Sequence, residues 1–172
     1  HVLKDFPMLR DYDIRQTFMK LGYNMRMTDM QAAFGIEQLR KLDENNERRK
    51  ENAAFFDESL GRHSDMIQLP AVGTHQKHVY YGYPIVVRED AGFSRKEITG
   101  YLKSKKIESR PFFGGCLPDQ PAFRDENIRV QGDLKVSRWI RDNAFFIGVH
   151  PGIGEEEREY IVDTFDEFFE KI

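Results

Sequence analysis

Cysteine is almost absent from this sequence: its 172 residues include only Cys116. One thiol excludes an internal disulfide framework and any zinc site built from several cysteines, and it suits a reducing compartment, so we expect a cytoplasmic protein. The sequence also lacks an excess of positive charge, because its formal net charge is −3 at pH 7, and this argues against electrostatically driven binding to nucleic acid. No apolar run approaches the roughly 20 residues that span a bilayer, so we expect neither nucleic acid nor a membrane as a partner.

Complete motifs for metal, phosphate or nucleophilic chemistry are missing as well. His75 and His78 are spaced like metal ligands, but no cysteine pair or glutamate-bearing helix accompanies them, so polar loop residues are favoured and we expect no metal site. The glycines from Gly148 to Gly154 lack the Lys-Ser/Thr pair of a Walker A loop, and a turn into the last helix explains them. Cys116 has no evident histidine or aspartate partner in its local sequence, so a loop residue is favoured over a nucleophile.

Local patterns predict the helices. Thr28 and Gln31 form a capping box before apolar residues at helical spacing, and Ser94 and Glu97 form a second one. Acidic residues from Glu155 onward suit the first turn of a closing helix. We therefore expect helices over about residues 28–42, 43–60, 94–106, 134–143 and from 155 to the end.

Strands are predicted between these helices, over residues 66–69, 79–87, 107–113 and 144–149. Pro84 places the second of them at a sheet edge or at a bulge. Residues 114–132, rich in proline and glycine, read as a long loop, and loops of that length in a compact domain are usually functional. The predicted fold class is α+β, with helices packed on a small, mainly antiparallel sheet.

The N-terminal segment carries much apolar surface without a helical stripe, so we expect it to pack against another surface. The chain begins at His1 rather than at a methionine, and we interpret it as a piece of a longer polypeptide.

One segment identifies a family. Residues 21–33, which read Leu-Gly-Tyr-Asn-Met-Arg-Met-Thr-Asp-Met-Gln-Ala-Ala, closely resemble the GYN-x-R-M-T/S-D-x-Q-A-A signature of the PLP-dependent nucleotide-sugar aminotransferases of the DegT–StrS group. The similarity continues through residues 35–39 and 48–50, and again at 105–110 and 120–123. It spans nearly the whole chain, from about Tyr12 to the end.

The resemblance implies the small C-terminal domain of the aspartate-aminotransferase fold, the fold type I of PLP enzymes. It implies an arm from a domain or dimer interface over residues 1–27, interdomain helices over 28–62 and a small α+β domain over 63–172. The family's Schiff-base lysine lies in a preceding large domain, and no lysine of this chain matches its motif. We therefore expect no catalytic residue here, an inactive isolated fragment without its own cofactor, and a homodimer in the full-length enzyme.

Three site residues follow from the same resemblance. The family's GYN asparagine reaches the phosphate of PLP, or of pyridoxamine 5'-phosphate (PMP), in the neighbouring subunit, and Asn24 matches it. Arg26 is the candidate for that phosphate region or for the diphosphate of a nucleotide-sugar substrate. Arg110, at the end of a predicted strand, is the candidate cation for contact with substrate, since guanidinium groups match phosphate oxygens.

The loop motifs differ from those of the ordinary aminotransferases. Residues 112–117 with Gln120 and Pro121 look more like the sugar 3-dehydratase branch, although Cys116 stands where that branch often has asparagine. Three interpretations stay open: an aminotransferase acting on a nucleotide-linked ketohexose in surface polysaccharide synthesis, a 3-dehydratase of the same family, and a non-catalytic interaction or regulatory domain with the same fold.

Overall fold

The computed structural model describes residues 23, 25–123 and 125–172, and the chain divides into two compact units, His1–Arg40 and Lys41–Ile172. Most of the predicted N-terminal arm lies outside the described residues. In the first unit, helix α1 spans Asp29–Arg40. The capping box at its start is confirmed, because the Thr28 backbone N–H donates to Gln31 Oε1 (2.9 Å) and the Gln31 N–H donates to Thr28 Oγ1 (3.3 Å).

Helix α1 exposes its apolar side chains, and none of its residues is buried. Phe34 and Leu39 are each 69% exposed. An isolated helix of this length is marginal in water and gains most of its stability from packing. The apolar side of α1 is therefore a surface for packing.

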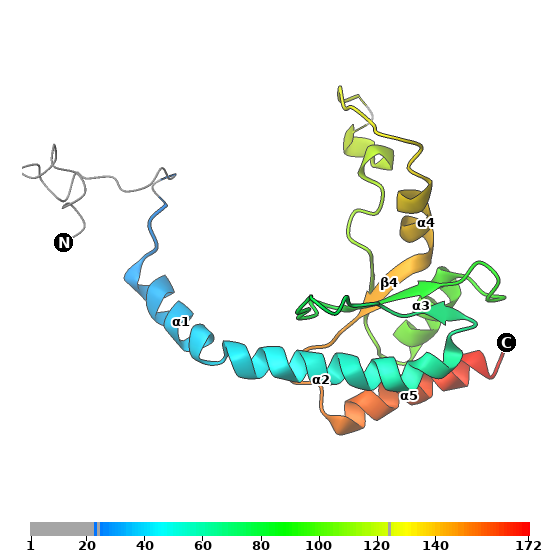
Figure 1. Cartoon of the computed structure of the whole chain (residues 1–172), viewed down its shortest axis with the longest axis horizontal. Coiled ribbons are helices and arrows are strands. Elements are labelled where there is room, and N and C mark those ends of the chain that lie inside the picture. Colours follow the sequence, from blue (N-terminus) through cyan, green and yellow to red (C-terminus); the bar gives the residue numbers. More distant parts are fainter. Residues whose placement is uncertain (1–22, 24, 124) are drawn as a thin grey trace, which may run out of the picture. The chain divides into compact units, whose positions relative to one another are not determined.

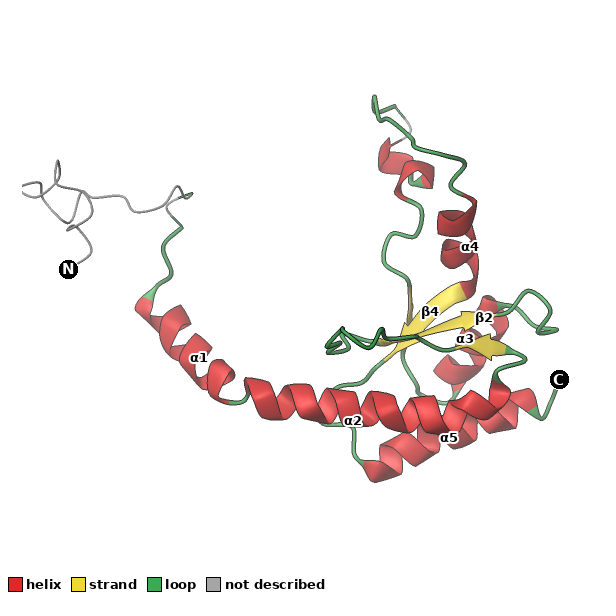
Figure 2. Ribbon diagram, in the orientation of Figure 1, coloured by secondary structure: helices red, strands yellow, loops and turns green. Residues whose placement is uncertain are grey.

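The second unit holds the remaining elements, and the predicted α+β class is confirmed (Figures 1 and 2). Its helices are α2 (Leu42–Leu60), α3 (Arg95–Ser104), α4 (Lys135–Asn143) and α5 (Glu155–Phe169). Its strands are β1 (Ile67–Gln68), β2 (Tyr83–Val87), β3 (Ser109–Pro111) and β4 (Ala144–Ile147), with 3-10 turns at Gly61–His63, Leu117–Asp119 and Pro121–Phe123. No helix of the described residues is long and apolar enough to cross a bilayer.

The four strands form one antiparallel sheet in the order β1-β2-β4-β3. The expectation of an edge strand around Pro84 is wrong for the strand as a whole, because β2 lies between β1 and β4. It holds locally, since β1 pairs only with Val86 and Val87 and leaves β4 as the sole neighbour at Pro84. The strand also begins later than predicted: β4 ends at Ile147, opposite Tyr83, and residues 79–82 have no partner strand.

Helices cover one face of the sheet. Helix α2 runs beside α5, and α3 also packs against α5 (Figure 2). Alternate residues of β2 point toward these helices, because Tyr83, Ile85 and Val87 are buried while Pro84 and Val86 are half-buried. The same core contains apolar side chains of α2, α3, α5 and β4, among them Phe56, Leu60, Ile98, Leu102, Ile161, Phe165 and Phe145. The opposite face of the sheet is open enough to carry a site.

Gly100 gives a first testable prediction. It lies inside α3, and no atom lies within 4 Å of the position that a Cβ would take. Glycine in a helix interior costs about 0.5–1 kcal/mol relative to alanine, so Gly100→Ala should raise the free energy of unfolding by that amount. Urea denaturation measures it, with Ser94→Ala as the opposing control, because loss of that N-cap should lower stability by about 1 kcal/mol. A destabilising Gly100→Ala would contradict the open environment.

Candidate functional site

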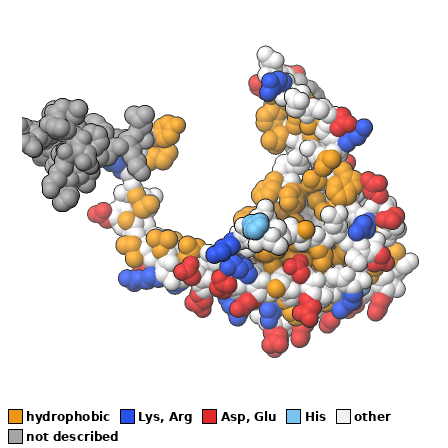
Figure 3. All heavy atoms as spheres, in the orientation of Figure 1, with side chains coloured by type: hydrophobic (Ala, Val, Ile, Leu, Met, Phe, Trp, Pro, Cys, Tyr) orange, Lys and Arg blue, Asp and Glu red, His pale blue; other side chains and the backbone are white. Residues whose placement is uncertain are grey.

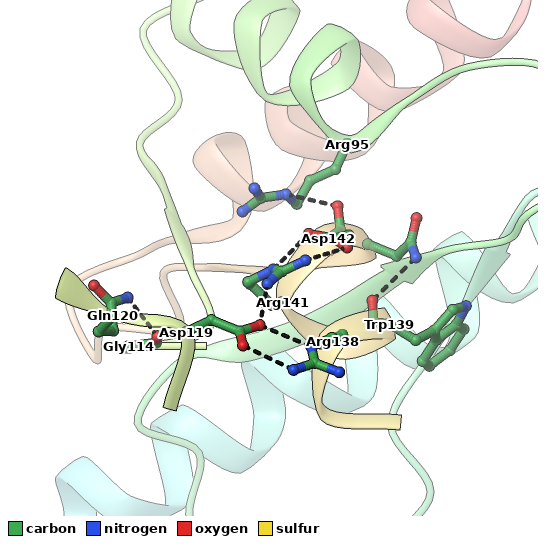
Figure 4. Close-up of polar contacts among 9 residues, drawn as sticks. Arg95, Gly114, Asp119, Gln120, Arg138, Trp139, Arg141 and Asp142 are labelled. Carbon is green, nitrogen blue, oxygen red and sulfur yellow. Dashed lines mark hydrogen bonds and ion pairs between the residues drawn. The ribbon is translucent and has the colours of Figure 1, made fainter. Parts of the chain in front are cut away.

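The loop over residues 114–132 is fastened to α4 by a group of ion pairs. Asp119 accepts two hydrogen bonds from Arg138, both at 2.9 Å, and one from Arg141 Nη1 at 2.5 Å (Figure 4). Arg141 also pairs with Asp142, whose backbone oxygen accepts from Arg95 Nε at 3.1 Å. Because the two arginines lie three residues apart on one helix, they reach the same carboxylate. We call Asp119, Arg138 and Arg141 the loop clamp.

The clamp shifts the titration of its carboxylate. The pKa of Asp119 is lowered, chiefly by the hydrogen bond from Arg138; burial opposes this as the second-largest effect, and the charges of Arg138 and Arg141 lower the pKa further. A hydrogen bond from the Cys116 thiol adds to the lowering. The sequence interpretation of Cys116 as lacking a local aspartate is therefore wrong: its partner is Asp119, in the 3-10 turn that follows it.

The lowered pKa predicts the pH dependence of the loop. A carboxylate with a depressed folded-state pKa contributes stability that is present above its unfolded value and is lost as pH falls through the folded value. Protection of the loop amides from hydrogen exchange should thus be constant near neutrality and fall once the pH drops below the ordinary aspartate value of 3.8. In Asp119→Asn the protection should be lower at neutral pH and lose this acid transition. An unchanged transition in that variant would assign it to another carboxylate.

Glycine is required where the loop passes α4. Gly115 has φ +63°, and a Cβ on it would lie 2.6 Å from Arg141 Cγ. Its backbone therefore has both a left-handed conformation and a close neighbour that other residues do not tolerate. Gln120 closes the same loop by donating to the Gly114 carbonyl at 2.7 Å.

Four aromatic rings gather on the open face of the sheet. Tyr81, Phe112, Phe113 and Phe146 contact one another with centroid separations of 5.8–6.4 Å. Tyr81 and Phe113 are 68% and 71% exposed, and Figure 3 shows hydrophobic side chains open to solvent on this side of the second unit. Gly82 permits the close approach of Phe146, whose ring lies 2.3 Å from the position of an added Cβ. Such a face suits a flat or apolar part of a ligand.

A cavity of about 530 Å³ adjoins these rings. Tyr81 and Phe146 line it together with three cationic side chains and two carboxylates, which are Arg49, Lys106, Arg110, Glu108 and Glu157. Arg110 lies opposite Phe146 in the β3–β4 ladder, and its guanidinium pairs with Glu108 at 2.9 Å. The hydrogen bond and charge of Glu108, with a smaller effect of Tyr81, raise the pKa of Arg110, which therefore stays charged. The cavity combines aromatic surface with fixed positive charge, a combination that suits an anionic organic ligand.

The three predicted site residues have different outcomes. Arg110 lies in the second unit and lines the 530 Å³ cavity. Arg26 lies in the first unit, on the exposed segment before α1. Asn24 lies outside the described residues, so its role stays a prediction.

The PLP site predicted from the family signature is described only in part, because Asn24 lies outside the described residues. A phosphate cradle needs several convergent donors, whereas the described part of the signature segment offers the single guanidinium of Arg26. Among the described residues there is also no group of three metal-ligating side chains. The His78 ring instead packs edge-on against the Tyr80 ring, with 4.2 Å between the ring centroids.

The loop clamp and the aromatic face were not predicted from the sequence. The i, i+3 spacing of Arg138 and Arg141 on a predicted helix was a usable signal for paired guanidinium groups. Nothing local to Asp119 pointed to them, because 19 and 22 residues separate it from its partners. The aromatic face likewise joins residues from three separate segments.

Similarity to known proteins extends over nearly the whole chain. The DegT/DnrJ/EryC1/StrS aminotransferase family matches residues 1–166. The lipopolysaccharide biosynthesis protein RfbH of Salmonella typhimurium is 37% identical over 158 residues, which cover 92% of this chain and 36% of that protein. The dTDP-4-dehydro-2,6-dideoxy-D-glucose 3-dehydratase of Saccharopolyspora spinosa is 34% identical over 160 residues, which cover 93% of this chain and 34% of that protein.

A solved structure shares the fold. The Escherichia coli GDP-4-keto-6-deoxy-D-mannose-3-dehydratase with bound hydrated PLP matches with a TM-score of 0.74 and 25% identity, over 90% of this chain and 39% of that chain. The chain thus spans about a third of the length of the curated relatives named above. The expected fold, that of fold type I PLP enzymes, is confirmed. By the extent of the family match and its agreement with the fold, the chain belongs to the DegT/DnrJ/EryC1/StrS aminotransferase family.

Proposed function

We propose that this chain is the small C-terminal part of a PLP- or PMP-dependent enzyme that removes the 3-hydroxyl group from a nucleotide-linked 4-keto-6-deoxyhexose. The observation that carries the proposal is the 34% identity to a sugar 3-dehydratase over 93% of the chain. The similarity to RfbH supports a place in the synthesis of surface polysaccharide sugars. Transfer of an amino group to the same ketone is the alternative reaction within the family.

The residues of the open sheet face have a role in this proposal. Arg110 binds the anionic part of the nucleotide sugar, while Tyr81 and Phe146 cover its flatter part. The support is the placement of a charged guanidinium beside exposed rings in one cavity. The loop clamp holds residues 114–132 next to α4 and so keeps the adjoining aromatic face in place.

The remaining parts of the proposal concern the whole enzyme. Asn24 donates to the cofactor phosphate of a neighbouring subunit, which makes the enzyme a homodimer, and Arg26 contacts that phosphate region or the substrate diphosphate. The arm, interdomain helices and small domain then span residues 1–27, 28–62 and 63–172, and the catalytic lysine or histidine belongs to a preceding domain. The enzyme works in the cytoplasm.

The reaction can be tested on the protein made from its natural reading frame, with PMP, glutamate and a nucleotide-linked 4-keto-6-deoxyhexose. Mass spectrometry of the product should show one oxygen atom fewer, as expected when the 3-hydroxyl is replaced by hydrogen. An amine in place of the ketone oxygen would establish the aminotransferase instead. A folded protein that changes neither ketone nor hydroxyl would favour the non-catalytic domain.

Arg110→Ala tests the binding role in the same assay. A hydrogen bond to a charged group contributes about 1.5 kcal/mol, so KM for the nucleotide sugar should rise roughly tenfold. Arg129→Ala removes an exposed loop arginine outside the cavity and serves as the matched control. Equal KM values in the two variants would remove Arg110 from the substrate site.

A further inference from the structure

A second, larger groove lies between α3 and the edge strand β3, with a volume of about 820 Å³. Five cationic side chains line it, and Glu108 is its one carboxylate. The cations are Arg95, Lys96, Lys103, Lys106 and Arg110. The chain as a whole carries a net charge of −3, so this concentration of positive charge does not reflect its composition. We call it the α3–β3 groove.

The lysines of the groove have no partners of their own in the part of the chain that the structure describes. Glu108 is taken by Arg110 at 2.9 Å, and Arg95 donates to the Asp142 carbonyl. Within the described residues, the side chains of Lys96, Lys103 and Lys106 make no hydrogen bond or ion pair. Like charges held together without counter-charges repel one another, and a bound anion would relieve that repulsion.

Two unfavourable backbone choices meet at this groove. Gly100 occupies the interior of α3, where alanine is more stable, and the space beside it is empty. Lys106 has φ +66° directly after the end of α3, a position where glycine is the usual residue. Gly100 therefore has no side chain at a position where one would fill the groove. Lys106 has a charged side chain at a position where the backbone conformation disfavours any side chain. Departures of this kind concentrate at binding sites.

The shape of the groove indicates the ligand. Lys96 and Lys103 are separated by two turns of α3, roughly 10 Å, so the positive charge extends farther than one phosphate group. A volume of about 820 Å³ is in the range of sites for whole small molecules. Lysine ammonium groups bind phosphates as point charges.

We propose that the α3–β3 groove binds a diphosphate group, either as free diphosphate or as part of a nucleoside diphosphate. Lys96, Lys103 and Lys106 supply the charge, and the missing side chain of Gly100 leaves room for the ligand. The site goes beyond the proposed function, since Lys96, Gly100 and Lys103 line the groove and not the 530 Å³ cavity, although Lys106 and Arg110 line both. Its test is a binding measurement that requires no turnover. Binding can therefore succeed or fail independently of the dehydratase assay.

Isothermal titration of the chain with inorganic diphosphate, at low ionic strength and without metal ions, tests the site. GDP and ADP form a second arm, and tighter binding of either than of diphosphate would identify a nucleoside ligand, whereas equal or weaker binding would identify diphosphate itself. Lys103→Gln should weaken binding about tenfold, the loss of one charge-assisted contact. Lys77→Gln, which removes an exposed lysine outside the groove, should leave it unchanged.

Variants at Gly100 and Lys106 distinguish an effect on binding from an effect on folding. Gly100→Glu should abolish binding by placing a carboxylate in the groove, whereas Gly100→Gln, nearly identical in shape, should weaken it far less. Lys106→Gly should raise the melting temperature, because it removes the left-handed lysine, and yet weaken diphosphate binding about tenfold. A purely structural Lys106 would change stability alone. Absence of diphosphate and nucleotide binding to the parent chain, or equal binding by Gly100→Glu and Gly100→Gln, would overturn the proposal.

Discussion

Phe145→Ala is expected to lower the free energy of unfolding by about 3–5 kcal/mol. Phe145 is fully buried in the middle of β4, opposite Ile85 on one side and Pro111 on the other. Its truncation removes apolar contacts from the strand that joins both halves of the sheet and leaves a cavity. Since domains of this size have a total stability of about 5–15 kcal/mol, the variant should be near its unfolding threshold. Urea denaturation followed by Trp139 fluorescence and circular dichroism measures the loss.

Phe113→Ala is the control for this prediction. It makes the same chemical change at a ring that is 71% exposed and contacts Tyr81 and Phe146. Those ring contacts are worth about 1 kcal/mol, so the loss should be no larger than that. Similar losses in the two variants would mean that β4 is not packed as described.

Gly115→Ala should loosen the loop that the clamp holds. A residue with a side chain costs about 1–2 kcal/mol in the left-handed conformation, and here the new Cβ also meets Arg141 Cγ at 2.6 Å. Arg141 must move, and its 2.5 Å ion pair with Asp119 is disturbed. We expect a loss of about 2–3 kcal/mol, measured as reduced hydrogen-exchange protection and faster proteolysis of residues 114–132.

Gly132→Ala separates the two causes. Gly132 lies in the same loop with φ +75°, but no atom lies within 4 Å of its Cβ position. This variant therefore carries the backbone strain without the collision, and should lose only about 1–2 kcal/mol. If Gly115→Ala costs no more than Gly132→Ala, the contact with Arg141 does not hold the loop.

Local sequence rules predicted the elements of this fold well. The capping boxes at Thr28 and Ser94 form as expected because each depends on residues only three positions apart. The acidic start of α5 is confirmed too, where Glu157 accepts a hydrogen bond from the Gly154 N–H at 2.9 Å. Features decided by distant partners were harder: Pro84 indicated an edge strand, whereas β2 as a whole lies between β1 and β4, and only the short pairing of β1 leaves Pro84 itself with one neighbouring strand.

In the candidate site, too, features that depend on nearby residues could be predicted from the sequence, and features that depend on distant residues could not. Arg110 could be selected from sequence because guanidinium chemistry and its position after a strand were both visible. Its surroundings could not, since Tyr81 and Phe146 come from segments about thirty residues away on either side. The α3–β3 groove was missed for another reason: Lys106 is an ordinary surface lysine in the sequence, and only its positive φ marks it.

The strand order has a consequence for synthesis on the ribosome. Strand β4 is the last strand in the chain, yet it lies inside the sheet, between β2 and β3. Until Ala144–Ile147 emerges, β3 has no partner strand and β2 has only the two-residue β1. A nascent chain that stops before residue 144 therefore exposes two unpaired strand edges, the surfaces through which chains aggregate. The sheet of this unit closes only after most of the chain has been translated.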